Sequence, residues 1–273
     1  MKISIYTFMR NGIYFDYHIV HMLKHHLPLA DEIIVNEGYS SDDTYNRIKN
    51  IEKKIKIFRE NWDVQKGMTI YARFKESARK KCRGEWCILL DSDEFIPEWE
   101  FKNIREYLEN SENDIIPLRY TNFYGNYKVY NKYPEKFNWP VFKHTIHRNL
   151  NDMEVWGDGS NVRLKGSAPV SHHDKYFDCH HFGAVRNAAR LRQKWHMHLK
   201  LSDTKNPRWD RTPGFLFDLM PYDWFDKDFL EYLAIYNGPF IKAVREDPDE
   251  FVRDNYVLYN FLLEKNRLYH RPD

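Results

Sequence analysis

WCILLDSD, residues 86–93, is the stretch of this sequence that decides its fold. Its first five residues form a short apolar run, which is typical of a strand buried on both faces of a sheet. Ligand sites of open α/β sheets lie at the carboxyl ends of such strands. Residues two apart in an extended chain point to the same side, so Asp91 and Asp93 should converge while Ser92 faces away.

Two carboxylates held this close repel each other unless a cation lies between them. Oxygen ligands of this kind suit Mg²⁺ or Mn²⁺, ions that typically connect a protein to the phosphates of a nucleotide. The motif therefore predicts that Asp91 and Asp93 bind a divalent metal and a diphosphate. For an isolated D-x-D motif, the alternative is a surface turn whose acids are only solvated.

Strand and helix patterns alternate upstream of this stretch. Apolar periodicity and turn residues predict strands at residues 2–7, 32–35 and 55–58 and helices at residues 15–27, 43–54 and 69–81. Alternation of this kind favours an α/β fold with a mostly parallel sheet covered by helices on both faces.

Four short motifs follow one another in the order of a known family: Glu37-Gly38 with residues 40–44, Ala78-Arg79, residues 83–86 and residues 89–94. In this order they resemble the nucleotide-sugar half of GT-A glycosyltransferases, specifically glycosyltransferase family 2, over roughly residues 1–99. The resemblance implies a GT-A-type, Rossmann-like domain and an enzyme that takes a sugar from a UDP- or GDP-sugar.

The resemblance also implies roles for single residues. Asn36 and Glu37, in the first turn, would contact the base or ribose of the donor, and Arg79 would also contact the donor. Asp91 and Asp93 would hold Mn²⁺ or Mg²⁺ on the donor diphosphate. The family usually has two aspartates where this chain has Asn36-Glu37, so the identity of the base is not predicted.

Histidines gather in the second half of the chain, where six of the 13 lie between residues 172 and 198. Imidazole favours transition metals, which leaves a metal-dependent hydrolase as an alternative, although no H-E-x-x-H motif is present. His181-Phe182-Gly183 resembles the segment in which related transferases supply a further metal ligand. Because adjacent residues of an extended segment face opposite ways, only one of His180 and His181 can point at the metal, and we expect it to be His181.

A helix is predicted from residue 184 to residue 201. Basic side chains recur on one face of it every four residues, at Arg186, Arg190, Lys194 and His198. A face of this kind opposite the D-x-D motif would bind the diphosphate, and we expect Arg186 and Lys194 to do so. The alternative is a basic helix face that is simply solvated.

An inverting transferase needs a base that deprotonates the acceptor hydroxyl. Asp158 is the leading candidate because it stands between two glycines, in a loop that permits close approach of a substrate. Glu154 and Asp174 follow it. A turn aspartate without a catalytic role is the alternative, and a retaining mechanism would need no such base.

Composition excludes several other classes of protein. The 273 residues carry 42 Lys and Arg against 40 Asp and Glu, a net charge of +2 that argues against general nucleic-acid binding. The three cysteines argue against a disulfide framework. No stretch approaches the length of a membrane span, and the start of the sequence has no signal-peptide pattern. We therefore expect a cytoplasmic protein without a transmembrane segment and leave a peripheral membrane contact open.

We expect three regions along the chain. Residues 1–111 would be the nucleotide-sugar-binding half, residues 112–201 the acceptor-binding and metal-completing half, and residues 202–273 a helical extension with two or three amphipathic helices. Aromatic residues between 120 and 142 would either form an acceptor surface for a glycan or lipid-linked substrate or pack in the core. The predicted function is metal-dependent, inverting sugar transfer. A noncatalytic nucleotide-sugar- or glycan-binding protein of the same fold remains a further alternative.

Overall fold

The computed structural model describes residues 1–62, 69–137, 141–168, 174–187, 189–194, 197 and 227–269. Its first elements are β1 (Ile3–Met9), α1 (Ile19–His26), β2 (Glu32–Glu37), α2 (Thr44–Ile48), β3 (Ile55–Arg59), α3 (Thr69–Arg79), β4 (Trp86–Leu89), β5 (Glu94–Phe95), η1 (Glu98–Glu100) and α4 (Phe101–Asn110). The elements that follow are β6 (Ile115–Tyr124), β7 (Asn126–Asn131), η2 (Pro134–Phe137), β8 (Phe142–Arg148), β9 (Met153–Trp156), β10 (Asn161–Leu164), β11 (Phe177–Ala184), α7 (Lys227–Tyr232), β12 (Leu233–Ile235), α8 (Lys242–Glu246), η3 (Pro248–Phe251) and α9 (Val257–Tyr269).

The first half of the main sheet is parallel. β1 pairs in parallel with β2 and β4, and β2 pairs in parallel with β3. Apolar side chains leave both faces of these strands. Ile5 packs with Met22 of α1 on one face, and Tyr6 packs with Ala78 of α3 on the other. The parallel α/β sheet predicted from the sequence is therefore confirmed.

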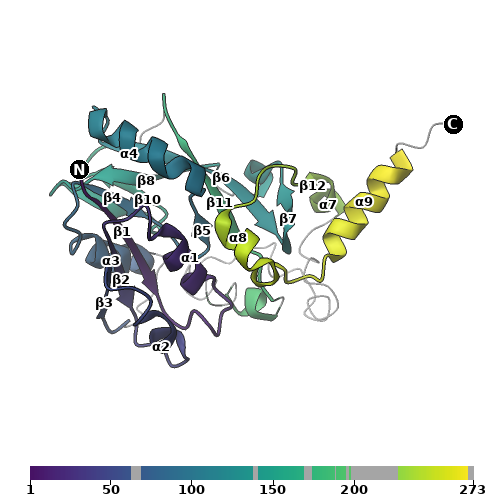
Figure 1. Cartoon of the computed structure of the whole chain (residues 1–273), viewed down its shortest axis with the longest axis horizontal. Helices are drawn as coiled ribbons and strands as arrows, with labels where there is room; N and C mark the ends of the chain where they lie inside the picture. The colour runs from purple at the N-terminus through teal and green to yellow at the C-terminus, as the bar shows by residue number, and fades with distance from the viewer. Residues whose placement is uncertain are drawn as a thin grey trace.

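The second half of the sheet is antiparallel and continues from β4. The strand order is β12-β7-β6-β8-β4-β1-β2-β3, and β8, β7 and β12 each pair antiparallel to their neighbours (Figure 1). β9 and β10 form a separate hairpin that packs against α3. The complete sheet is thus mixed, and its parallel part is the part that the family-like motifs occupy.

β11 connects segments that lie far apart in the sequence. It runs parallel to β6 and antiparallel to the short strand β5, which follows the D-x-D motif. The register places His181 opposite Glu94 on one side and opposite Asn122 on the other. β11 therefore carries its histidines to the carboxyl end of β4, where a ligand site is expected.

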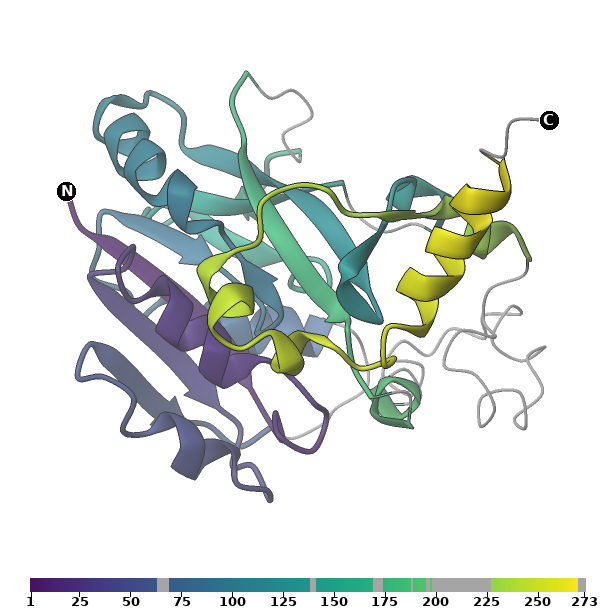
Figure 2. The ribbon, with the colours of Figure 1, turned by 45° about the vertical axis from the view of Figure 1, so that its right-hand side comes forward.

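The C-terminal region contains helices and one strand. We expected amphipathic helices in this region, from Asp226 onward. Asp226 lies outside the described residues. Leu233–Ile235 form a strand, β12, on the edge of β7. The edge of β7 offers unpaired backbone groups, and pairing with β12 satisfies them, which explains this difference. α9 lies at the end of the molecule away from β1–β3 (Figure 2).

Four helices differ from the predicted bounds. α3 ends at Arg79 and not at residue 81, and the helix predicted over residues 184–201 does not begin at Ala184, because Ala184 pairs with Tyr124 as the last residue of β11. α1 begins at Ile19 and not at residue 15, because Asp16 adopts a left-handed backbone with φ 55° that a helix does not accept. α2 covers only Thr44–Ile48 of the predicted residues 43–54. Within the described part of the chain, we find no helix that is both long enough and apolar enough to cross a membrane.

Candidate functional site

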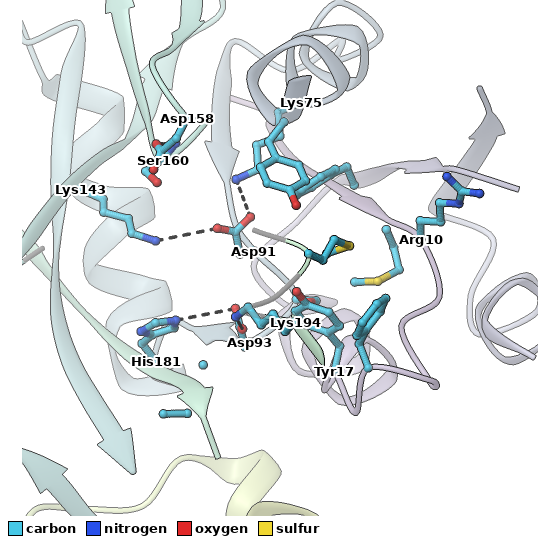
Figure 3. Close-up of a pocket in the computed structure, with 18 of the residues that line it drawn as sticks. Arg10, Tyr17, Lys75, Asp91, Asp93, Lys143, Asp158, Ser160, His181 and Lys194 are labelled. Atoms are coloured by element: carbon cyan, nitrogen blue, oxygen red, sulfur yellow. Dashed lines mark hydrogen bonds and ion pairs between the residues drawn. The ribbon is translucent and has the colours of Figure 1, made fainter. Parts of the chain in front are cut away.

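A cavity of about 350 Å³ opens at the carboxyl end of β4 (Figure 3). Its lining includes the charged side chains of Asp91, Asp93 and Lys194 together with the imidazole of His181. Aromatic rings, among them Phe8 and Trp62, also line it. The cavity therefore offers both polar and apolar surface to one ligand.

Asp91 is paired with two buried lysines. Its Oδ1 lies 2.6 Å from Nζ of Lys75 on α3, and its Oδ2 lies 3.8 Å from Nζ of Lys143 on β8. Burial alone would raise the pKa of Asp91, but the two ammonium groups outweigh it and lower that pKa. Lys143 also binds Glu94 at 2.5 Å. Asp91 is therefore ionised and already neutralised.

Asp93 has a separate set of cations. Its Oδ2 accepts a hydrogen bond from Arg186 and lies 3.8 Å from Nζ of Lys194. Its Oδ1 lies 3.8 Å from Nε2 of His181. Although burial opposes ionisation, Lys194 and Arg186 hold the pKa of Asp93 well below its usual range. Asp91 and Asp93 thus form their ion pairs with different cations.

The two adjacent histidines of β11 point to opposite sides. Nδ1 of His181 lies 2.7 Å from the side-chain oxygen Oδ1 of Asn122, so Nδ1 carries the proton and Nε2 keeps a lone pair toward Asp93. Burial lowers the pKa of His181 to about 3, which keeps the ring neutral. His180 instead lies 3.2 Å from the hydroxyl of Tyr236, on the far side of the sheet from Asp93. His181 has the geometry of a metal ligand, whereas His180 is packed in the interior.

Arg186 and Lys194 both reach Asp93 but differ in their position. Arg186 is fully buried behind the carboxylate, where it also donates to the carbonyls of Gly183 and Phe15 and stacks on Tyr17 at 3.6 Å from the ring centroid. Lys194 belongs to the helical residues 189–194 and lines the cavity. Burial and the nearby Arg186 lower the pKa of Lys194 to about 8. Of the two side chains, Lys194 is therefore the one that faces the cavity.

Asp158 lies in the turn between β9 and β10 and lines the cavity. Its side chain is exposed, and one oxygen accepts the backbone N–H of Ser160 at 3.0 Å. Glu154 pairs with Arg163 at 2.8 Å, and neither Glu154 nor Asp174 is among the described residues that line the cavity. Of the three candidate bases, Asp158 alone faces the cavity.

Three residues that we expected to contact the donor do not line the cavity, namely Asn36, Glu37 and Arg79. Glu37 is fully buried, and its carboxylate accepts the backbone N–H of Ser40 at 2.6 Å and of Tyr39 at 3.2 Å and pairs with Arg59 at 2.6 Å. Asn36 and Arg79 also bind other groups within the fold: Asn36 donates to Glu60 and to the carbonyl of Phe74, and Arg79 binds Glu76 and the carbonyl of Leu150.

Some residues of the site were not predicted from the sequence. Lys75, Lys143 and Asn122 were overlooked, as was the aromatic wall that contains Tyr17. One signal was available, because Lys75 follows Ala72 and precedes Ala78 on the apolar face of a helical pattern, where a lysine needs a partner. Four predicted histidines, His172, His173, His196 and His198, lie outside the described residues.

A divalent metal fits part of this donor set. Nε2 of His181 and Oδ1 of Asp93 face each other without a hydrogen bond between them, and the bond of His181 to Asn122 fixes the ring as metal-binding histidines require. Within the described ranges, no three His, Cys, Asp or Glu side chains are arranged as a complete metal site. Mg²⁺ and similar ions are usually held by one or two carboxylates together with substrate phosphates, so a complete protein cage is not required.

Comparisons with known proteins identify the family. The family model for glycosyl transferase family 2 matches residues 18–160, just over half of the chain. The crystal structure of S. aureus TarS 1–349 has a TM-score of 0.45 and 16% identity over 100% of this chain and 94% of that one, and its complex with UDP has a TM-score of 0.46 and 16% identity over the same shares. Glucosyl-3-phosphoglycerate synthase from Mycobacterium tuberculosis, in complex with Mn²⁺, UDP and phosphoglyceric acid, has a TM-score of 0.34 and 21% identity over 44% of this chain and 43% of that one. No match was found among curated protein sequences. The assignment to a family rests on the family model.

Proposed function

Because this chain belongs to glycosyl transferase family 2, we propose that it transfers a sugar from a UDP- or GDP-sugar to a hydroxyl group of a glycan or lipid-linked acceptor, with inversion at the anomeric carbon. One observation carries the proposal. A single cavity joins the opposed pair Asp93 and His181 to the cation Lys194 and to the free carboxylate of Asp158. A ligand in this cavity can therefore contact both the residues proposed to bind the donor and the residue proposed to accept the proton.

The lining of the cavity offers a contact to each part of the donor. The ammonium of Lys194 attracts the two negative charges of a diphosphate, and Arg186 holds Asp93 in position beside it. Phe8 and Trp62 stack on each other with ring centroids 5.1 Å apart and give the cavity an apolar wall that the base can contact. We propose that Asn36, Glu37 and Arg79 support these walls from behind.

Asp93 and His181 would hold a divalent metal, either Mn²⁺ or Mg²⁺, and Asp91 would join them through Oδ2 while its Oδ1 keeps the ion pair with Lys75. When bound, such an ion supplies Lewis-acid stabilisation of the charge that develops on the leaving diphosphate. Asn122 keeps the proton of His181 on Nδ1 and so leaves Nε2 available.

Asp158 would accept the proton of the acceptor hydroxyl as that oxygen attacks the sugar. Its exposed carboxylate keeps one oxygen free of hydrogen bonds to the described residues, since only Oδ1 accepts from Ser160. The aromatic rings that line the cavity exclude water from its charged side chains and so favour transfer over hydrolysis of the donor. We propose residues 1–111 for donor binding, residues 112–201 for the acceptor and for completing the metal site, and residues 202–273 as an extension.

Other assignments have less support. A metal-dependent hydrolase would need several histidines at one point, but His180 and His181, the adjacent pair of the cluster that the structure describes, point to opposite sides. Membership of a glycosyltransferase family favours an enzyme over a noncatalytic binding protein. A reducing compartment such as the cytoplasm suits the three free, buried cysteines, and we propose that location for a role in glycan biosynthesis.

The first prediction tests donor binding and chemistry separately. UDP or GDP with Mn²⁺ at about 100 times its dissociation constant should stabilise the protein by about 2.7 kcal/mol in thermal unfolding, and much less with a chelator. Asp93→Ala should lose this effect, because the metal and the cations around it lose their carboxylate. Asp158→Asn should keep it but lose about 10²- to 10⁴-fold in turnover. Equal stabilisation with chelator would contradict the metal site, and near-normal turnover of Asp158→Asn would contradict the base.

A further inference from the structure

The hairpin that carries Asp158 is fastened to α3 by side chains of that helix. Among the described residues, Lys75 Nζ donates to the carbonyl of Gly159 at 2.8 Å, Glu76 Oε2 accepts the N–H of Val155 at 3.1 Å, and Arg79 Nη1 donates to the carbonyl of Leu150, just before β9, at 3.3 Å. The turn between β9 and β10 therefore cannot move independently of α3 while these bonds persist.

Among these three side chains, Lys75 alone also reaches the D-x-D motif. The same ammonium that binds Gly159 lies 2.6 Å from Oδ1 of Asp91, and it lies 4.9 Å from the centroid of the Phe8 ring. An ammonium has three donors, and here they face a carboxylate, a carbonyl and a ring face. Lys75 is only 3% exposed, so it has no donor left to offer a substrate.

The contact at Gly159 is close on the backbone side as well. Gly159 has φ 87°, and a Cβ added to it would lie 3.0 Å from the backbone nitrogen of Ala72 and 3.1 Å from Cδ of Lys75. The turn thus packs directly against α3, and the side chain of Lys75 forms part of this contact. Asp158 is the residue next to Gly159, so the position of its carboxylate depends on this contact.

We propose that Lys75 is a positioning residue that holds the carboxylate of Asp158 at a fixed distance from the donor site. The inference rests on the proposed function, in which Asp158 is the base and Asp91 belongs to the donor site. The oxygen of a base must lie within about 2.6–3.2 Å of the hydroxyl oxygen whose proton it accepts, and a displacement of about 1 Å can cost about 10²-fold in rate. One buried ammonium bound to both Asp91 and Gly159 fixes that distance between the two halves of the site.

The test compares Lys75→Met with Asp158→Asn and with the double variant. Lys75→Met should lower kcat for transfer about 10- to 100-fold. Its affinity for UDP with Mn²⁺ should not fall, because Asp91 loses a cation that competes with the metal. In the Asp158→Asn background, Lys75→Met should cause no further loss of transfer, since it acts through Asp158. Lys80→Met is the matched control, because this side chain is 66% exposed beyond the end of α3, and its kinetics should match those of the wild type.

Several outcomes would overturn the inference. Near-normal turnover of Lys75→Met, or independent losses that multiply in the double variant, would show that Lys75 does not act through Asp158. A loss of nucleotide affinity in step with turnover would assign Lys75 to donor binding. If Lys75→Met does not fold, Gly159→Ala decides the question, since its methyl group displaces the turn from α3 without touching Asp91. Near-normal turnover of Asp158→Asn would remove both the base and this inference, whereas a normal Lys75→Met beside an impaired Asp158→Asn removes the inference alone.

Discussion

Lys194 is the residue of the site whose charge responds to pH near neutrality. Burial and the positive charge of Arg186 oppose its protonation, and Asp93 favours it at 3.8 Å. Its pKa of about 8 lies below the ordinary value of 10.5, so the side chain is charged below pH 8 and neutral above it. A diphosphate beside Lys194 therefore loses a cationic partner as the pH rises.

The second prediction follows from this sign. Affinity for UDP or GDP should fall as the pH rises through about 8, by up to about tenfold per unit, because binding then requires uptake of a proton. Lys194→Arg should remove this decline, since a guanidinium stays charged at these pH values. Lys194→Met should bind weakly at every pH. Calorimetric titrations between pH 6.5 and about 9.5 measure all three proteins, and an equal decline in Lys194→Met would assign the effect to another group.

At the scale of elements, the parallel half of the fold could be predicted from the sequence and the antiparallel half could not. β1, β2 and β4 are largely apolar and buried on both faces, and apolar residues at helical spacing, such as Met22 on α1 and Ala78 on α3, mark the helices that cover them. β6 to β8 mix aromatic, polar and charged residues, because their side chains alternate between the core and the site. Lys143 of β8 is such a residue, and only tertiary structure shows that it faces Asp91.

The same limit explains what was found and missed in the site. Asp91 and Asp93 follow directly from a strand end, and the alternation of side chains along β11 separates His181 from His180. The partner of His181, Asn122, lies 59 positions away on β6 and leaves no local pattern. Which cations neutralise a buried acid depends on the packing of elements that are distant in the sequence. The periodicity of apolar residues does not reveal this packing.

The third prediction concerns the attachment of α9. Asp254 is buried at the start of this helix, where it accepts the N–H groups of Tyr256 and Leu258, both at 3.0 Å, and binds the amide of Asn126 at 2.9 Å. Asp254→Ala should lower the free energy of unfolding by about 1–3 kcal/mol, since it removes a helix cap and leaves a buried amide unpaired. Nucleotide affinity should not change, because α9 is remote from the cavity. Denaturant unfolding measures the effect, the exposed Asp249→Ala serves as its control, and equal stability of the two variants would contradict the role of Asp254.

At the scale of the whole molecule, three distant segments meet beside the cavity. The loop that lines the cavity with Phe15 and Tyr17 also contains Asp16, whose carboxylate accepts Arg253 at 2.8 Å and the backbone N–H of Asn187 at 2.7 Å. The C-terminal region and the segment after β11 thereby hold one wall of the cavity. Donor affinity should therefore depend on residues that touch no part of the donor.

The fourth prediction tests this dependence with Arg253→Met. Asp16 and Arg253 are 22% and 18% exposed, and breaking their paired hydrogen bonds should cost about 1–3 kcal/mol of stability. Burial opposes ionisation of Asp16, but Arg253 and Asn187 outweigh it and lower its pKa below the ordinary 3.8. The stabilisation is therefore fully present above pH 3.8 and disappears as the pH falls through the lower pKa of the folded state. The stabilities of the wild type and Arg253→Met should therefore converge in acid.

Nucleotide affinity of Arg253→Met at neutral pH should also weaken, because the wall formed by Phe15 and Tyr17 loosens. Arg245→Met, which breaks a more exposed pair with Glu98, is the matched control, and a constant difference in stability from neutral to acid pH would show that the pair with Asp16 is not the cause.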